Sequence, residues 1–277
     1  MFTLALIQMQ VVPGDSSANL SKATHLTAEA ARNGADIILL PEVLDVGWTD
    51  PSAQSKATPI PDGETCRCLS ESARKHSVYI CAGMAERSDT LVYNAAVLIN
   101  PEGEVILHHR KINELDIAHP YYAQGDRLFV CHTALGTIGI MICADGFARN
   151  LVISRSLGYM GADIILSPCS WAVSADHNNT ATPYGKLWID SYMPVAREFK
   201  LWITAVSNVG WITSGPWQGS KCIGCSLVMD PDGTTVAKGP YGVDAETILY
   251  VPVEPVPRPA RGCEWNDLWK KVKSNTE

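Results

Sequence analysis

The chain repeats part of its own sequence once. Residues 34–41 read Gly-Ala-Asp-Ile-Ile-Leu-Leu-Pro, and residues 161–168 read Gly-Ala-Asp-Ile-Ile-Leu-Ser-Pro. Two further pairs of similar segments follow in the same order, 73–80 with 196–203 and 97–103 with 227–233. The paired segments lie 123 to 130 residues apart, so each half of the chain is expected to form the same supersecondary unit. The repeat therefore predicts a fold made of two equivalent halves.

Each half alternates strand and helix patterns. In the first half we expect strands at 2–10, 35–41, 78–85, 94–100 and 104–110, and helices at 17–33 and 64–76. In the second half we expect strands at 137–143, 163–168, 201–207, 224–230 and 234–238, and helices at 147–160 and 184–199. This order indicates βαβ units with antiparallel hairpins at the sheet edges. Because the helices cover one face of each sheet, the sheets are expected to pack together as a four-layer αββα sandwich of two pseudo-symmetric α/β halves.

The length of the chain and its last residues predict where the domain ends. A chain of 277 residues fits one large domain, and we assign residues 1–250 to a single domain. Residues 251–260 contain four prolines, which argue against a ladder strand or a helix there. Residues 251–277 are therefore expected to form an extended C-terminal tail. Its apolar residues Trp265, Leu268 and Trp269 are expected to lie at a subunit interface.

Composition excludes several classes of protein. A chain with 46% hydrophobic and 18% charged residues buries a sizeable core. The net charge of −7 and the lack of a basic run beyond Lys270 and Lys271 argue against a nucleic-acid partner. The sequence also has no basic leader and no uninterrupted apolar stretch of about 18 residues, so we expect a cytoplasmic protein with no membrane segment. Nine cysteines, an odd number, indicate reduced thiols rather than a disulfide framework.

Three polar residues end apolar runs that are expected to form strands: Glu42, Lys111 and Cys143. Ligands of open α/β sheets bind at the carboxyl ends of strands, so these residues are the first candidates for chemistry. Cys143 precedes the helix expected at 147–160, an arrangement that exposes a nucleophile at a strand-to-helix turn. The helix N-terminus and a nearby ammonium group would lower the pKa of this thiol.

Each candidate also has an ordinary structural explanation. Taken alone, Glu42 fits a solvated carboxylate, Lys111 a charged sheet edge and Cys143 an inert thiol.

The cysteine pairs 66/68 and 222/225 are far apart and lack partners at zinc-binding spacing, so no metal is expected. The serine hydrolase, phosphate-loop and dinucleotide-binding motifs are missing, so no organic cofactor is expected. A dyad of Cys143 with His119 or His132, and a non-catalytic protein that binds a small ligand or another protein, remain as alternatives.

Taken together, the segments Leu40-Pro41-Glu42, His109-Arg110-Lys111 and Ile142–Phe147 resemble the nitrilase superfamily of carbon-nitrogen hydrolases. The resemblance extends over residues 2–251 and implies the αββα fold. It also implies that Glu42, Lys111 and Cys143 form a catalytic triad that needs no cofactor. Members of this family dimerise through the region of the helix at 184–199, with C-terminal segments crossing between subunits. We therefore expect a homodimer or a higher homo-oligomer.

The resemblance implies an amidase-type hydrolase that acts on a small-molecule amide through a thioester and releases ammonia or an amine. Hydrolysis of a nitrile or an N-carbamoyl group is the alternative within the family. Many amidases have a second glutamate roughly eight positions after the lysine, where this chain has His119. Glu114 is the nearby glutamate, so either Glu114 takes the role of that residue or the role is absent.

The expected substrate site combines the triad with aromatic side chains. Lys111 and the backbone N–H of Ala144 are expected to stabilise the oxyanion, and Glu42 is expected to act as the general base. The aromatic residues expected to contact the substrate are Trp48, Tyr121, Phe147 and Trp171. No Lys or Arg other than Lys111 has an obvious place in the pocket, which favours a neutral substrate.

Overall fold

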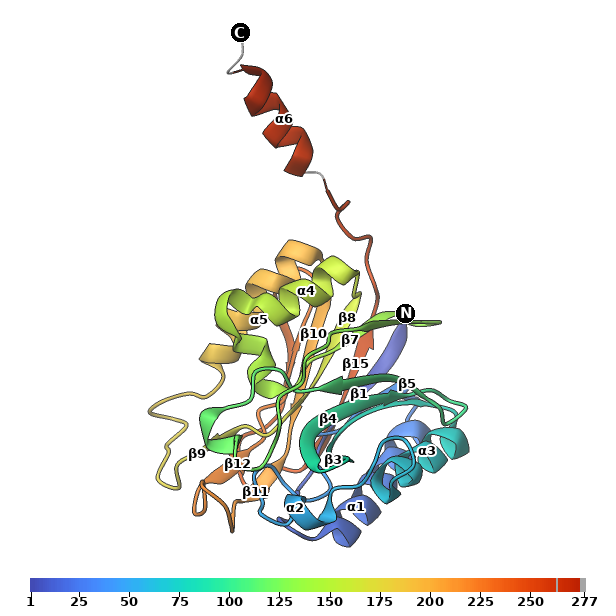
Figure 1. Cartoon of the computed structure of the whole chain (residues 1–277), viewed down its shortest axis with the longest axis vertical. Coiled ribbons are helices and arrows are strands. Elements are labelled where there is room, and N and C mark those ends of the chain that lie inside the picture. Colours follow the sequence, from blue (N-terminus) through green and yellow to red (C-terminus); the bar gives the residue numbers. More distant parts are fainter. Residues whose placement is uncertain (263, 275–277) are drawn as a thin grey trace.

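The structure is a computed structural model that describes residues 1–262 and 264–274. Two six-stranded sheets lie face to face, with helices on the outer side of each (Figure 1). Helices α1 (Ser16–Arg32) and α3 (Glu64–His76) cover the first sheet, and α4 (Val152–Met160) and α5 (Lys186–Phe199) cover the second. The predicted αββα sandwich is confirmed.

The first sheet has the strand order β15-β1-β2-β3-β4-β5. Its strands are β1 (Phe2–Gln8), β2 (Ile37–Leu39), β3 (Tyr79–Ser88), β4 (Leu91–Ile99), β5 (Val105–Arg110) and β15 (Thr247–Val253). Strands β1, β2 and β3 are parallel, and β4 and β5 continue the sheet as antiparallel neighbours. At the other edge, β15 pairs antiparallel with β1.

The second sheet has the order β14-β13-β10-β8-β7-β6 and repeats this topology. Its strands are β6 (Val130–Thr133), β7 (Gly136–Ile140), β8 (Ile164–Cys169), β10 (Trp202–Ser207), β13 (Leu227–Met229) and β14 (Thr235–Lys238). Strands β7, β8 and β10 are parallel, β13 and β14 follow antiparallel, and β6 pairs antiparallel with β7. The repeated segments 34–41 and 161–168 thus contain the equivalent strands β2 and β8.

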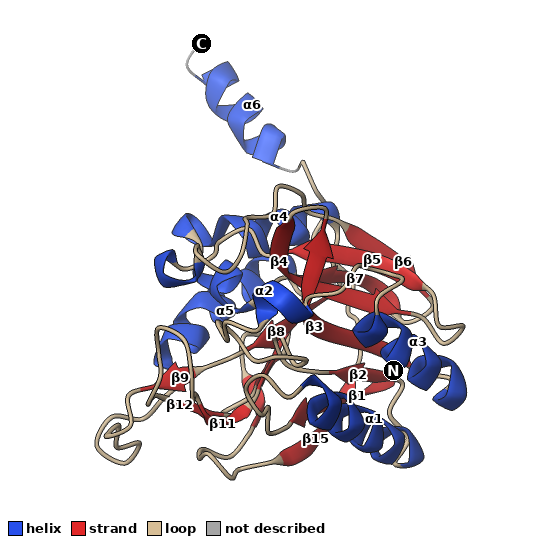
Figure 2. Ribbon diagram, turned by 60° about the horizontal axis from the view of Figure 1, so that its bottom comes forward, coloured by secondary structure: helices blue, strands red, loops and turns tan. Residues whose placement is uncertain are grey.

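Shorter elements connect these layers, and most of them were not predicted (Figure 2). They are α2 (Ala53–Lys56), β9 (Ala172–Val173), β11 (Val209–Trp211), β12 (Lys221–Ile223) and three 3₁₀ helices at Asp116–Ala118, Cys143–Phe147 and Arg149–Leu151. The helix α6 (Glu264–Ser274) lies outside the layers, near the end of the chain. Elements of two to five residues are too short to show a hydrophobic period. Among the described residues, no helix has both the length and the apolar character needed to span a membrane.

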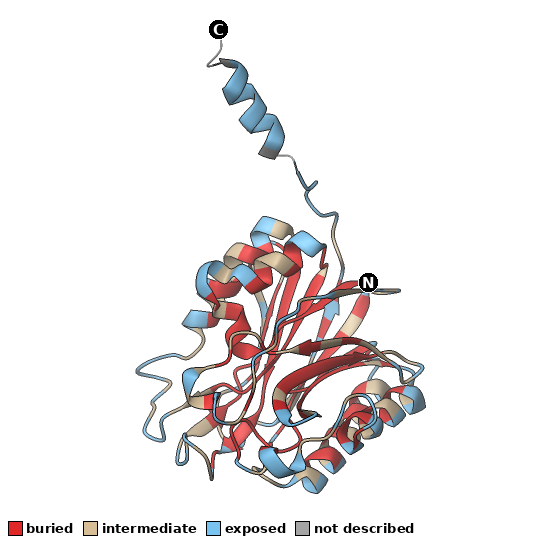
Figure 3. Cartoon of the chain, viewed as in Figure 1, coloured by how far each residue is buried: buried red, intermediate tan, exposed pale blue. Residues whose placement is uncertain are grey.

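The core lies between the layers, where buried residues concentrate (Figure 3). In β1, Leu4 and Leu6 belong to the cluster that includes the second sheet, whereas Ala5 and Ile7 pack with helix residues such as Leu20. A strand buried on both faces needs an apolar side chain at each position rather than at alternate positions. This explains the continuous apolar run near the start of the chain. Of the nine cysteines, the eight within the described residues are free, and Cys263 lies outside them.

The expected helix at 147–160 begins later than predicted. Helix α4 starts at Val152, and two 3₁₀ helices occupy Cys143–Phe147 and Arg149–Leu151. Asn150 and Leu151 have positive φ values of 59° and 55°, a conformation that a continuous right-handed helix does not contain. The nucleophile candidate therefore precedes a single short turn and not a long α-helix.

The tail also differs from the prediction, because strand β15 continues to Val253 and includes Pro252. Pro252 lies opposite Thr3, whose backbone N–H donates to Asp36 Oδ2 and whose carbonyl accepts from the Asp36 N–H, each at 2.8 Å. Thr3 therefore turns its hydrogen-bonding groups toward Asp36, and Pro252 needs no N–H at this edge position. After an extended segment, α6 forms a helix that projects from the body (Figure 1). Residues 263 and 275–277 of the predicted tail lie outside the described residues.

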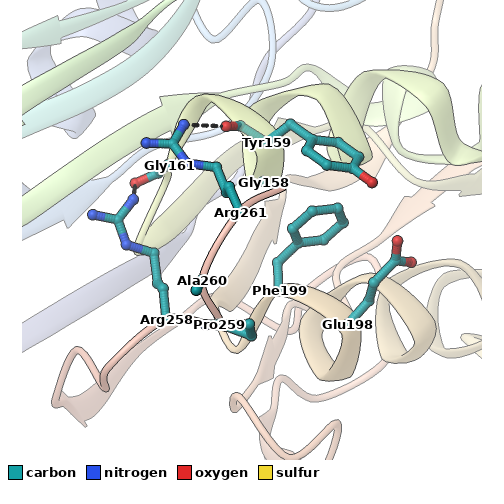
Figure 4. A pocket seen from close by; sticks show the side chains of 9 residues that line it. All are labelled: Gly158, Tyr159, Gly161, Glu198, Phe199, Arg258, Pro259, Ala260 and Arg261. Atoms are coloured by element: carbon teal, nitrogen blue, oxygen red, sulfur yellow. Dashed lines mark hydrogen bonds between the residues drawn. The ribbon is translucent and has the colours of Figure 1, made fainter. Parts of the chain in front are cut away.

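Two arginines attach the tail to the C-terminal end of α4 (Figure 4). Arg258 donates to the carbonyl oxygen of Gly161, and Arg261 donates to that of Tyr159. Arg258 also forms an ion pair with Asp163 at 3.1 Å. The last carbonyl groups of a helix lack partners within the helix, so cations there stabilise it.

Replacing Arg258 should weaken this attachment. In Arg258→Ala, one carbonyl and the partly buried Asp163 lose a partner, which should cost about 1 kcal/mol and lower the melting temperature by about 2–4 °C. Differential scanning calorimetry measures the change. Arg127→Ala, which removes a solvent-exposed ion pair with Asp126, is the control and should leave the melting temperature unchanged. Equal melting temperatures for all three proteins would contradict this account of the tail.

Candidate active site

The three candidate residues come together at one pocket, although they follow three different strands. Glu42 follows β2, Lys111 follows β5 and Cys143 follows β7, and all three line a cavity of about 180 Å³. The other residues around this cavity are Trp48, Leu115, Ala144, Phe147, Ser170, Trp171, Ala172, Tyr184, Leu187, Trp188 and Trp217. The two halves meet here, since the N–H of Glu42 donates to the carbonyl of Cys169 in β8 at 3.3 Å. The three residues that the sequence places at strand ends thus lie around one cavity.

Lys111 lies buried between two carboxylates. Its Nζ is 2.8 Å from Glu42 Oε1 and 3.1 Å from Glu114 Oε1, and all three side chains are buried. Burial alone would lower the pKa of Lys111, but the charges of Glu42 and Glu114 outweigh burial and raise it well above its usual value. Lys111 therefore stays protonated and acts as a fixed positive charge.

Glu42 has one occupied and one unoccupied carboxylate oxygen. Oε1 accepts from Lys111 Nζ at 2.8 Å and from Asn94 Nδ2 at 2.7 Å, while Oε2 is buried and has no hydrogen-bond partner within the part of the chain that the structure describes. Burial raises the pKa of Glu42, and the charge of Lys111 with these hydrogen bonds opposes the shift without cancelling it. Oε2 is therefore the oxygen that can accept a proton.

Asn94 connects the two carboxylates and was missed in the sequence analysis. Its Nδ2 donates to Glu42 Oε1 at 2.7 Å and to Glu114 Oε2 at 3.3 Å. Asn94 is fully buried within the otherwise apolar strand β4. A lone amide in such a strand needs partners, and this was the signal that could have identified it.

Cys143 begins a short 3₁₀ helix with a positive φ of 44°. A non-glycine residue in this conformation indicates a constrained turn, as expected for a nucleophile at the end of a strand. The pKa of the Cys143 thiol is raised well above its usual value by a hydrogen bond with Cys169, by burial and by the charge of Glu42, while Lys111 only partly offsets them. The predicted lowering of this pKa is therefore wrong, because a long helix N-terminus is absent and a carboxylate lies close by. The resting thiol is neutral and needs a base.

Asp145 holds the cysteine turn against the lysine loop. Its buried carboxylate accepts the backbone N–H groups of Ile142, Ile112 and Asn113 at 2.9, 3.1 and 2.7 Å, and it pairs with His109 Nε2 at 2.8 Å. Burial would raise the pKa of Asp145, but His109 and the N–H donors outweigh burial and lower it. This network fixes the position of Cys143 relative to Lys111.

The family model for carbon-nitrogen hydrolases matches residues 3–256. The chain belongs to the carbon-nitrogen hydrolase family. It is 33% identical over 236 residues to a nitrilase of Pyrococcus abyssi, covering 83% of this chain and 82% of that protein. It is 28% identical over 263 residues to the omega-amidase NIT2 of Mus musculus, covering 91% and 88%. A carbon-nitrogen hydrolase structure from Helicobacter pylori G27 has a TM-score of 0.79 at 22% identity, covering 98% and 94%. The predicted membership of the nitrilase superfamily is confirmed.

Within this carbon-nitrogen hydrolase, the structure distinguishes Glu114 from His119. Glu114 contacts Lys111, whereas His119 Nε2 pairs with the backbone oxygen of Glu114 at 3.3 Å. Neither His119 nor His132 lines the pocket, and His132 pairs with Thr137 Oγ1 instead. The second carboxylate beside Lys111 is thus that of Glu114, three positions after the lysine, and position 119, eight after it, provides none.

Of the four aromatic residues named from the sequence, three line the pocket. Trp48, Phe147 and Trp171 line the pocket, but Tyr121 does not. Tyr121 packs beside the cluster that contains Trp48, and its carbonyl accepts from Gln54 Nε2 at 2.6 Å. The pocket also contains Tyr184, Leu187, Trp188 and Trp217, which the sequence analysis did not assign to it. Tyr184 precedes α5, Leu187 and Trp188 lie in its first turn, and Trp217 lies in the loop after β11, so no common motif identifies them.

Asp145→Asn should destabilise the carbon-nitrogen hydrolase. An amide offers one acceptor oxygen instead of two, so a buried N–H loses its partner, which costs about 1–3 kcal/mol. The pKa of Asp145 is lowered in the folded state. The ionised carboxylate therefore contributes fully to the free energy of unfolding above its unfolded pKa of about 3.9, and this contribution is lost as pH falls below that value. Thermal unfolding from pH 3 to pH 8 should show a large difference in melting temperature between wild type and variant, and this difference should become smaller below about pH 4.

The matched control is Asp126→Asn, because the Asp126 carboxylate is solvent-exposed beside Arg127. This variant should unfold like the wild type at each pH. Equal melting temperatures of wild type and Asp145→Asn at pH 7, or a difference that stays constant down to pH 3, would contradict the role assigned to the buried carboxylate.

Proposed function

We propose that this carbon-nitrogen hydrolase cleaves the carboxamide C–N bond of a small amide through a thioester on Cys143. One observation supports this most directly: a neutral buried thiol and a carboxylate with an unoccupied oxygen line the same pocket as a permanently charged lysine. The thiol is the nucleophile, the carboxylate is the base and the lysine is the oxyanion partner that covalent amide hydrolysis needs.

In the acylation step, Glu42 Oε2 accepts the proton of Cys143 as the sulfur attacks the carbonyl carbon of the amide. The carbonyl oxygen becomes negative and is stabilised by Lys111 and by the backbone N–H of Ala144, each contributing about 3 kcal/mol. Glu42 then gives its proton to the amide nitrogen. The C–N bond breaks, ammonia or an amine leaves, and a thioester remains on Cys143.

In the second step, Glu42 accepts a proton from water as the water oxygen attacks the thioester carbon. The C–S bond breaks, the carboxylic acid is released and the proton returns to the sulfur of Cys143. Over both steps, one amide and one water molecule are converted to one carboxylic acid and one molecule of ammonia or amine. The raised pKa of Glu42 suits this role, because the same group must accept and donate a proton near neutral pH.

We favour an amide over a nitrile or an N-carbamoyl compound because Glu114 adds a second carboxylate beside Lys111. A second glutamate near the lysine is the feature that the family resemblance connects with amidases. The names of the relatives include both nitrilase and omega-amidase, so they do not decide between these substrates.

Cys143→Ala should abolish turnover. Ammonia release from acetamide, propionitrile and N-carbamoylglycine measures which bond is cleaved, and intact-mass spectrometry should detect an acyl adduct on the wild type only. Cys131→Ala, in β6 and outside the pocket, is the control and should retain full activity. Ammonia release by Cys143→Ala would refute the thioester mechanism, and release from the nitrile alone would replace the amidase assignment.

Asn94→Leu should move the pH dependence of hydrolysis. The hydrogen bond from Asn94 lowers the pKa of Glu42, so its removal raises that pKa further above the ordinary value of about 4.3. Glu42 accepts the thiol proton only when ionised, so the acidic limb of the kcat/KM profile should move to higher pH. Asn100→Leu removes a similar amide-to-carboxylate contact, to Glu104, at an exposed turn and should leave the profile in place. An unshifted limb in Asn94→Leu would show that Asn94 does not position the base.

We also propose that the protein forms a homodimer through its C-terminal helix. In α6, Trp265, Leu268 and Trp269 lie on one face, and Trp265 is 60% exposed. The ribbon of α6 is coloured as exposed (Figure 3). The surface of α4 presents the exposed apolar residues Val152 and Tyr159. Both surfaces belong to one chain, so a twofold arrangement can bury each against its counterpart in a second copy. The cavity of about 440 Å³ beside Tyr159 and the base of the tail is one place for such a contact (Figure 4).

A chain truncated after Gly262 tests this assembly. Light scattering at micromolar concentration should show a dimer for the full chain and a smaller species for the truncated chain. Leu91→Ser, at an exposed apolar residue of the first sheet, is a matched surface control and should remain dimeric. A full-length monomer, or an unchanged assembly after truncation, would exclude a role of α6 in dimerisation.

A further inference from the structure

Six aromatic side chains line the active-site pocket: Trp48, Phe147, Trp171, Tyr184, Trp188 and Trp217. Trp171 and Trp188 stack with ring centroids 4.6 Å apart and planes at 19°, and Phe147 lies 5.4 Å from Trp188. On another part of the wall, Trp48 and Trp217 meet edge to face at 5.1 Å. Trp171 follows β8, Phe147 ends the 3₁₀ helix Cys143–Phe147 and Trp188 lies on α5, whereas Trp48 and Trp217 come from loops after β2 and β11. Two separate sets of rings therefore surround the space beside the triad.

The pocket offers no charge to a substrate beyond the triad. Of the described residues that line it, only Glu42 and Lys111 have ionic side chains. Lys111 is paired with Glu42 and Glu114 and is assigned to the oxygen of the reacting carbonyl, so it does not also neutralise a carboxylate elsewhere on the substrate. Burying a carboxylate without a partner is costly.

A cationic acyl group is disfavoured for a related reason. Aromatic faces attract cations, but Lys111 Nζ already lies 5.6 Å from the centre of the Trp48 ring. A second cation in the same small space would be repelled by this permanent charge. The walls therefore suit an uncharged group.

The size of the pocket limits the acyl group to about one ring. Its volume is about 180 Å³. An apolar cavity of roughly 150 Å³ in another protein accommodates benzene. With the carboxamide at Cys143, the remaining space suits a single six-membered ring or a branched alkyl group of similar size.

We infer that the acyl pocket selects neutral amides with a small, planar aromatic acyl group, and that Trp217 determines this preference. The inference rests on the proposed amidase function and adds the substrate class. Aromatic pairs gain attraction beyond the area that they bury, so a planar ring should be preferred to a saturated ring of equal size. Trp217 is half-buried on an irregular loop, so its replacement disturbs the core less than replacement of Trp171 or Trp188.

Four amides test the substrate class by ammonia release. Succinamate and 4-methylpentanamide have the same shape and differ by a carboxylate in place of an isopropyl group, and kcat/KM should favour the neutral compound on the order of 100-fold. Phenylacetamide and cyclohexylacetamide differ in planarity while a methylene separates the ring from the carbonyl. Phenylacetamide should be preferred by about 2- to 10-fold.

Trp217→Leu should reduce the ratio of phenylacetamide to cyclohexylacetamide to about one. Trp211→Leu is the matched control, because Trp211 is exposed six residues earlier and does not line the pocket, and it should keep the wild-type ratio. A ratio near one in the wild type, or an unchanged ratio in Trp217→Leu, would overturn the inference.

Leu187→Arg provides a second variant that does not alter the aromatic wall. Leu187 lines the pocket and is 54% exposed on α5, so a cation there reaches the mouth of the pocket without entering the core. The variant should raise kcat/KM for succinamate relative to 4-methylpentanamide, and Leu91→Arg, at a similarly exposed residue outside the pocket, should not. Equal use of succinamate and 4-methylpentanamide by the wild type would overturn the substrate class while leaving the amidase function intact. Absence of ammonia and of any Cys143 adduct with all four amides would overturn both.

Discussion

One buried cation between two buried carboxylates determines the arrangement of the active site. Lys111 Nζ lies within 3.1 Å of a carboxylate oxygen of both Glu42 and Glu114 in the interior, where an unpaired charge is expensive. Each partner is therefore needed by the others, and any shift of β2 or β5 would separate them. Asn94 satisfies an oxygen of each carboxylate and leaves Glu42 Oε2 as the single oxygen able to accept a proton.

The two similar halves have taken different parts in this site. The first half provides the charged groups Glu42, Lys111 and Glu114 and the amide of Asn94. The second half provides Cys143 and most of the aromatic wall. Packing of the sheets face to face brings the strand ends of both halves to one place, and Asp145 joins the cysteine turn to the lysine loop. A repeated scaffold has thus produced one asymmetric site.

The sequence predicted what depends on strand ends and failed where long-range contacts decide. Glu42, Lys111 and Cys143 were identified because each directly follows an apolar run, and the repeat predicted the equivalent sheets. Asn94 lies in mid-strand, and its role depends on carboxylates that are 52 and 20 residues away. The direction of the Cys143 pKa shift depends on burial and on Cys169, which local sequence does not report. Trp217 reaches the pocket from a loop, where no periodicity applies.

The pairing of β15 with β1 has a consequence for biosynthesis. Residues 247–253 complete a sheet whose other strands all lie within the first 110 residues. During translation the first half therefore emerges with the edge of β1 unpaired, and it stays so until almost the whole chain has left the ribosome. An open strand edge pairs readily with other chains, so this interval is when a nascent molecule is most prone to aggregate. Closure of the first sheet is a late event that joins the two ends of the domain.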